Sequence, residues 1–281
     1  MSVKIMVDST ADLIPRVARR VTIVPLAIRF GDREFLDGVT IDSRQFYEML
    51  VESDELPTTS QANPAVFEEA FSEAVARGQQ VVCITCSAKL SGTYQSAVIA
   101  AGEFPGKVFV VDSKTIALGS AILTEYALEL QDKGLSAEEI VWKLMQKREK
   151  VRLIAMLDTL EYLKRGGRIS KTVAFAGGLL NIKPVVCIED GEIKMLGKAR
   201  GSRQGNNLLV QEIRKAGGVD FQKPMLLGYT GLSDTLLRKY IDDSAQLWQG
   251  CAEELPVSIV GSVVGTHAGP GAVAVAFFSA E

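Results

Sequence analysis

The fold is indicated most clearly by residues 63–84, which read NPAVFEEAFSEAVARGQQVVCI. Asn63 can cap a helix by accepting from its free N–H groups, and Pro64 suits the first helical position. Gly78 suits the position just after the helix. A helix over residues 64–77 is therefore expected, followed by an apolar strand over residues 81–84. A helix that leads into a buried strand is typical of α/β proteins.

The same alternation extends in both directions from this stretch. Further strands are predicted over residues 3–7, 21–30 and 108–111, and further helices over 97–102 and 117–133. After a helix at 137–150, which is expected to act as a hinge, strands are predicted over 153–157, 184–189, 192–196, 225–229, 257–260 and 272–278. Helices at 206–215 and 235–243 alternate with them, and Asp190-Gly191 suits a hairpin turn.

These elements predict an α/β protein of two domains. Residues 1–150 are expected to form a mostly parallel sheet with helices on both faces. Residues 151–281 are expected to form a smaller α/β domain with a mixed sheet, and a ligand is expected between the two domains.

Composition excludes several classes of protein. The chain has 281 residues, 47% of them hydrophobic, with a net charge of −3 and no basic tract, which argues against nucleic-acid binding. No signal peptide is recognisable and no apolar run reaches the ~18 residues of a membrane span, so a soluble, cytoplasmic protein is expected. Cys83 and Cys86 have CxxC spacing but lie within a predicted strand, without a second pair or a nearby histidine. We interpret them as core residues.

Small hydroxyl side chains occur where strands are predicted to end. Thr59 and Ser60 lie in one such segment, and Ser91 precedes Gly92 in another. Ligands of parallel sheets bind at the carboxyl ends of strands, and a helix N-terminus with a hydroxyl can bind an anion. Each segment taken alone is equally compatible with a turn or a helix cap.

The only histidine, His267, lies within Gly-Thr-His-Ala-Gly-Pro-Gly at residues 265–271. This stretch is expected to be a loop whose glycines leave the imidazole without neighbours that would bury it. With the hydroxyl segments, His267 could form a neutral pocket for a carboxylate or phosphate group.

Two enzymatic hypotheses remain open at this point. Asp8 and Asp12 could be the carboxylates of a magnesium-dependent phosphatase, although a helix cap is the favoured interpretation of this segment. Ser91 and His267 could be a serine esterase pair, but the sequence has neither a GxSxG motif nor an acid beside His267 to orient it.

Two further stretches are unusual. Arg165 and Arg168 flank a glycine pair, which suits either an anion-binding loop or the capped end of a helix. The apolar, glycine-flanked stretch 173–180 could be core or one wall of a tunnel.

Taken in order, six segments resemble the DegV family: residues 7–12, 57–61, 91–97, 165–170, 180–184 and 266–271. They span nearly the whole chain. The resemblance implies a two-domain α/β protein that holds a long-chain fatty acid between its domains. Bacterial members serve as the fatty-acid-binding subunit of fatty acid kinase in phospholipid metabolism. A separate ATP-dependent kinase subunit phosphorylates the bound carboxylate to an acyl phosphate.

The family's functional positions carry over to particular residues. The resemblance implies a fatty-acid-binding set of Thr59, Ser60, Ser91, Gly92 and His267. It implies supporting roles for Ser9, Arg165 and Arg168, and contact with the kinase subunit for Arg200 and Arg203. Gln204 and Gly205 replace lysines that are common after that basic segment. No catalytic residue, metal or cofactor is expected in this chain, and membrane contact is expected to be at most transient, for loading of fatty acid.

Overall fold

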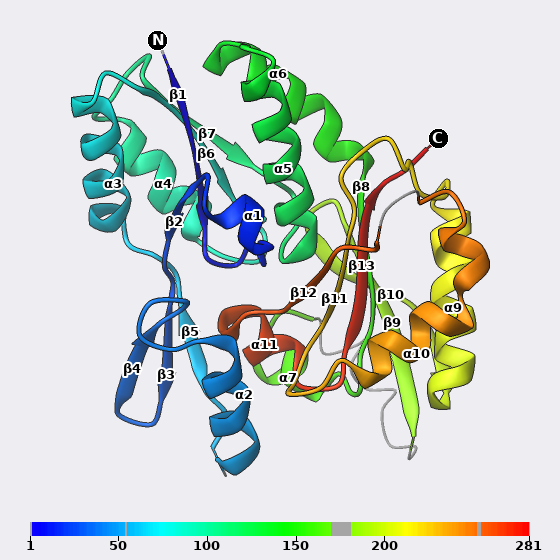
Figure 1. The fold of residues 1–281 in the computed structure, drawn as a ribbon. Helices are drawn as coiled ribbons and strands as arrows, with labels where there is room; N and C mark the ends of the chain where they lie inside the picture. The colour runs from blue at the N-terminus through cyan, green and yellow to red at the C-terminus, as the bar shows by residue number, and fades with distance from the viewer. Residues whose placement is uncertain (1, 54, 170–180, 252–253, 281) are drawn as a thin grey trace.

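The computed structural model describes residues 2–53, 55–169, 181–251 and 254–280. A four-stranded, all-parallel sheet has the order β2-β1-β6-β7. Its strands are β1 (Val3–Asp8), β2 (Thr22–Val24), β6 (Gln80–Thr85) and β7 (Val108–Asp112). The layers on its two faces are α3 (Pro64–Ala76) with α4 (Thr93–Ala101), and α5 (Leu118–Asp132) with α6 (Ala137–Lys147) (Figure 1). The predicted parallel sheet with helices on both faces is confirmed.

The helix that opened the sequence analysis begins as predicted. Asn63 caps α3, since its side-chain oxygen accepts from the backbone N–H of Val66 at 3.2 Å, and Pro64 occupies the first turn. Gly78, with φ of +74°, follows the helix end in the left-handed conformation that glycine adopts readily.

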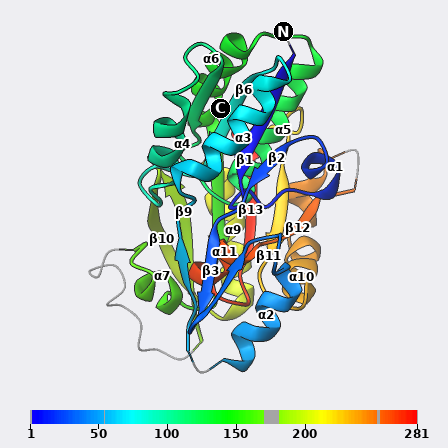
Figure 2. The same ribbon diagram turned by 90° about the vertical axis from the view of Figure 1, so that its left-hand side faces the viewer.

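Residues 21–30 do not form the single strand that was predicted. Pro25 interrupts them, because proline cannot donate to a strand ladder. β3 (Ala27–Phe30) instead joins β4 (Arg33–Leu36) and β5 (Thr58–Ser60) in a small antiparallel sheet. Figure 1 and Figure 2 both show this sheet and α2 (Ser43–Glu52) below the parallel sheet. This unpredicted sheet holds Thr59.

The second large sheet has six strands in the order β10-β9-β8-β13-β11-β12. The strands are β8 (Val151–Met156), β9 (Ile182–Glu189), β10 (Glu192–Arg200), β11 (Leu226–Tyr229), β12 (Val257–Ile259) and β13 (Val273–Phe278). β11 and β12 pair in parallel and the other neighbours pair antiparallel, so the predicted mixed sheet is confirmed. Asp190 and Gly191, both with positive φ, form the predicted hairpin turn.

The two faces of the mixed sheet have different partners. α9 (Gly201–Lys215) and α10 (Thr235–Asp243) cover the outer face, where Val273, Val275 and Phe277 are buried. The inner face packs on α5, which also contacts β1 and β6. α5 therefore lies between the two large sheets and joins them into one core. Within the described ranges, no helix has both the length and the apolar composition needed to cross a membrane.

A short helix from the C-terminal half is anchored to the N-terminal half. α11 (Ser262–Ala268) lies between β12 and β13 in sequence. Asp12 accepts from the N–H of Gly261 at 2.7 Å, and Asp37 accepts from the Ser262 hydroxyl at 2.7 Å. The hydroxyl of Tyr47 donates to the carbonyl of Val260 at 3.0 Å. These buried contacts fix α11, and with it His267, against the N-terminal half.

Candidate ligand-binding site

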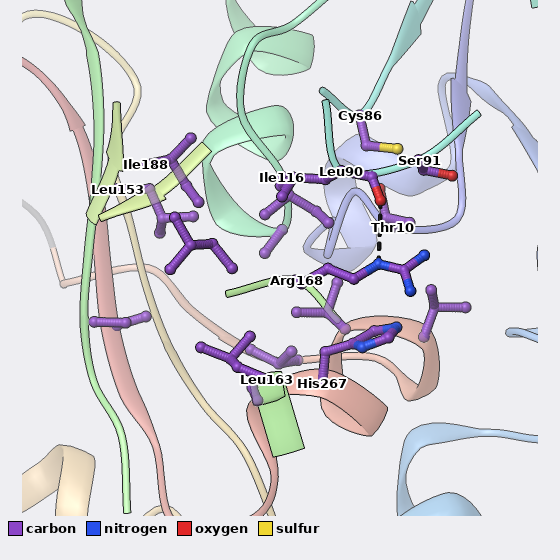
Figure 3. Close-up of a pocket in the computed structure, with 18 of the residues that line it drawn as sticks. Thr10, Cys86, Leu90, Ser91, Ile116, Leu153, Leu163, Arg168, Ile188 and His267 are labelled. Atoms are coloured by element: carbon purple, nitrogen blue, oxygen red, sulfur yellow. Dashed lines mark hydrogen bonds between the residues drawn. The ribbon is translucent and has the colours of Figure 1, made fainter. Parts of the chain in front are cut away.

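An apolar cavity of about 120 Å³ lies between the two halves of the protein. The N-terminal half contributes Leu26 and Leu90, and α11 contributes Val263 and Val264. The inner face of the mixed sheet supplies much of the remaining wall. Figure 3 shows apolar side chains such as Leu153, Ile116 and Ile188 directed into this space. Because the walls come from both halves, the ligand site predicted between the domains corresponds to a real cavity.

Polar groups gather at one end of the cavity. Thr59 on β5 and His267 on α11 share a hydrogen bond of 2.9 Å between Oγ1 and Nε2. Ser91, just before α4, shares one of 2.9 Å with the hydroxyl of Thr93. Ser60 also lines the cavity. The fold thus brings together four of the five residues predicted to bind the head group, and hydroxyl groups with one imidazole provide the polar contacts.

His267 is mostly buried and lies in a helix, contrary to the prediction of an unburied loop residue. It lies in the last turn of α11, which ends at Gly269 with φ of +70°. Burial, and secondarily the charge of Arg168, lowers the pKa of His267 from 6.5 to about 4. The imidazole is therefore neutral near pH 7, and its Nδ1 is buried without a hydrogen-bond partner.

Gly166 makes room for this imidazole. A Cβ at that position would lie 2.1 Å from Nδ1 of His267, closer than any real contact. The Gly166-Gly167 pair therefore has a packing role, in addition to ending α7 (Glu161–Arg165). The sequence suggested a capped helix end or an anion loop, and the structure combines a helix end with close approach to the site.

Arg168 connects the two halves beside the polar end. Its Nε donates to the carbonyl of Leu90 at 3.2 Å, and its Nη1 donates to the carbonyl of Gly166 at 2.5 Å (Figure 3). Leu90 belongs to the same loop as Ser91, so Arg168 fixes that loop relative to α7. Its charge also faces His267, which makes protonation of the imidazole less favourable.

Two of the predicted residues, Gly92 and Ser9, do not line the cavity but contact residues that do. Gly92 is the N-cap of α4, and the side chain of Gln61, which lines the cavity, lies close against it: a Cβ at Gly92 would be 2.0 Å from the side-chain oxygen of Gln61. The hydroxyl of Ser9 accepts from the backbone N–H of Leu26 at 3.1 Å and donates to Asp37. Ser9 therefore supports the segment between β2 and β3.

The remaining predicted arginines lie away from the cavity. Arg165 is 61% exposed and pairs with Glu161 at 3.0 Å. Arg200 and Arg203, where β10 passes into α9, are both exposed. The apolar stretch 173–180, predicted as core or tunnel wall, lies outside the described residues.

A second depression lies on the other side of the Thr59–His267 pair. It shares Thr59, Arg168 and His267 with the apolar cavity, and Tyr162 and Arg165 also line it. Thr59, Arg168 and His267 thus border a second depression as well as the apolar cavity, and the lining of that depression includes apolar as well as polar surface.

Asp8 and Asp12 do not cap a helix of their own. α1 (Pro15–Ala18) begins after Ile14, without a side-chain cap. The Asp8 carboxylate accepts from the N–H groups of Thr10 at 3.0 Å and Cys86 at 2.7 Å. Burial raises the pKa of both carboxyls, which disfavours the charged form a magnesium site needs. The described ranges contain no cluster of metal-ligating side chains.

The esterase hypothesis gains no support from the geometry either. Ser91 is hydrogen-bonded to Thr93, whereas His267 is hydrogen-bonded to Thr59. The other ring nitrogen of His267 has no acid to orient it. A serine nucleophile needs a hydrogen bond to its histidine and an acid that orients that histidine.

Some cavity residues were not predicted as site residues. Thr10 and Cys86 line the cavity from the ends of β1 and β6, and Ala155 and Ala274 line it from the mixed sheet. Cys83 is buried in the core, as predicted for both cysteines, but Cys86 also faces the cavity. The position of Thr10 and Cys86 at strand ends was the signal that could have identified them.

Comparisons with known proteins agree with this arrangement. The profile of the DegV family matches residues 2–280. A DegV domain-containing protein of Caldanaerobacter subterraneus is 34% identical over 98% of both chains. The structure of a fatty-acid-binding DegV family protein from Thermus thermophilus superposes with a TM-score of 0.88 at 31% identity, covering 99% of this chain and 100% of the other. The fatty acid kinase B3 protein of Streptococcus pneumoniae, loaded with linoleic acid, superposes with a TM-score of 0.85 at 26% identity over 99% of both chains.

The family profile covers nearly the whole chain, and the relative matches over almost its full length. The two-domain α/β fold is shared with proteins solved with fatty acids. This chain belongs to the DegV family.

Proposed function

We propose that the cavity binds one long-chain fatty acid, with its carboxylate at Thr59, Ser91 and His267. The observation that carries this proposal is an apolar cavity between the two halves that ends in hydroxyl groups and a neutral imidazole. A tail of about sixteen carbons buries about fourteen methylenes at roughly 0.8 kcal/mol each, or about 11 kcal/mol before ordering costs. The likeness to fatty-acid-binding structures supports the same ligand.

The polar end is suited to holding a carboxylate without enclosing it. A bidentate arginine would bind the carboxylate more strongly and would cover the oxygen that must react. Here two donors of Arg168 are directed to backbone carbonyls, and the hydroxyl groups of Thr59, Ser60 and Ser91 line the cavity. Arg168 thus acts on the head group through its charge and through the position of the Ser91 loop.

We propose further that the protein is a carrier, which presents the bound carboxylate to a separate ATP-dependent kinase subunit for conversion to an acyl phosphate. The depression beside the Thr59–His267 pair offers an approach for that subunit. The likeness to a fatty acid kinase protein supports this role. Exposed Arg200 and Arg203 are candidate contacts with the kinase subunit.

The test combines binding and turnover. The purified protein is extracted with organic solvent and assayed for acyl chains by mass spectrometry, then incubated with ATP, with and without a fatty acid kinase subunit. Acyl phosphate, trapped as the hydroxamate, is expected only with the kinase subunit. Hydrolysis of phosphate esters or acyl esters by the protein alone would favour the enzymatic alternatives and overturn the carrier role.

A further inference from the structure

The wall that the mixed sheet gives to the cavity changes in side-chain size along the strands. Ala274 on β13 pairs with Ala155 on β8, and both line the cavity. Two residues before Ala155 on the same face of β8, the cavity is lined by Leu153, and it is also lined by Ile188 and Ile193, which pair between β9 and β10. On β8 a small lining side chain is therefore followed by a large one, and on β9 Val186, which pairs with Ala155, is followed by the larger Ile188.

Leu153 and Ile188 lie at the opposite end of the cavity from the head group (Figure 3). Figure 3 shows Leu153 and Ile188 on the opposite side of the cavity from Ser91 and His267. A tail that starts at the polar end therefore runs toward these two large side chains.

Ile188 also separates the cavity from a charged region outside. It lines both the apolar cavity and a polar depression that carries Arg148, Arg152 and Glu189. Its neighbour Cys187 borders both spaces as well, but packs with the core on the other face of the sheet. An apolar tail that extended past Ile188 would move from apolar surroundings to charged groups and water. Its further methylenes would therefore add no binding free energy.

We propose that Ile188, together with Leu153, is the end stop that sets the longest acyl chain this protein accepts. This proposal rests on the proposed function, namely that the cavity holds a fatty acid tail. Each buried methylene raises affinity about fourfold. Affinity therefore rises with chain length until the tail reaches Ile188, and the rise stops there because a closely packed wall does not yield without cost.

The experiment measures Kd for a series of saturated fatty acids of increasing length with three variants. Ile188→Ala shortens the end stop, and the length at which affinity stops rising moves to longer chains. Ala155→Leu adds a large side chain to the cavity wall, and that length moves to shorter chains. Ile182→Ala is the matched control, because Ile182 lies on the same strand, is also half-buried and does not line the cavity.

The outcomes separate this proposal from the one on which it rests. Binding of fatty acids in every variant with an unchanged limiting length overturns the end stop and leaves fatty acid binding intact. An equal move in Ile182→Ala overturns it too, since the change would then be a general loosening of the sheet. No binding of any chain length by the wild type overturns the proposed function itself. If Ile188→Ala does not fold, the test rests on Ala155→Leu. A limiting length that moves to shorter chains then supports the proposal, and an unchanged limiting length overturns it.

Discussion

Replacing His267 with glutamine is expected to remove a pH dependence of stability that the buried imidazole creates. In the unfolded chain His267 titrates near 6.5, whereas in the folded protein its pKa is lowered to about 4. Between these values the unfolded state binds more protons, so stability is fully present above 6.5 and is lost as pH falls. One pKa unit corresponds to about 1.4 kcal/mol, so the shift predicts a loss of about 2 kcal/mol between about pH 7 and about pH 5. The glutamine side chain carries no charge in this range, so His267→Gln is expected to lack this loss.

The assay is urea unfolding of ligand-free protein at both pH values, with the variant subtracted from the wild type. The subtraction is needed because Asp8, Asp12 and Asp37 have raised pKa values and contribute with the opposite sign. Their contribution is common to both proteins and cancels. Equal pH dependence in the two proteins would refute the assignment of His267 as a buried neutral imidazole.

Further predictions concern the head group and can be tested by titration with fatty acid. Ser91→Ala and Thr59→Val are each expected to weaken binding by about 1.5–3 kcal/mol, the worth of one hydrogen bond to a charged group, without abolishing it. Gly166→Ala is expected to weaken binding as well, because the new methyl group displaces His267; unchanged affinity would show that this imidazole does not contact the ligand. His267→Ala is expected to reduce acyl-phosphate formation with the kinase subunit more than it reduces fatty acid binding, and equal losses would make it a binding contact alone. Loading with fatty acid is expected to raise the pKa of His267, because a carboxylate favours the imidazolium. This pKa can be measured by NMR.

The parts of the fold that follow from local chemistry were predictable. Asn63, Pro64 and Gly78 mark the ends of one helix, and Asp190-Gly191 marks a hairpin, since each needs only its own backbone conformation. The hydroxyl residues of the head-group end could be named, because strand ends and family motifs coincide there. Their hydrogen bonds could not, since Thr59 and His267 are 208 positions apart in the chain.

Other features depend on contacts that no local pattern contains. The run from residue 21 to 30 was apolar enough for one strand, but Pro25 divides it between two sheets. Glycines around His267 suggested a loop, whereas α11 forms because the N-terminal half fixes its first turn through Asp12 and Asp37. The cavity itself is made where small residues such as Ala155 and Ala274 leave space, and small size in a strand has no distinct sequence signature.

The central claim is that this cavity holds a fatty acid, and native mass spectrometry of protein purified without added lipid tests it most directly. The expected spectrum contains a species heavier than the polypeptide by one long-chain fatty acid, and organic extraction of the same sample releases that acid. Protein at the bare polypeptide mass, which also takes up no fatty acid on titration, would contradict the claim.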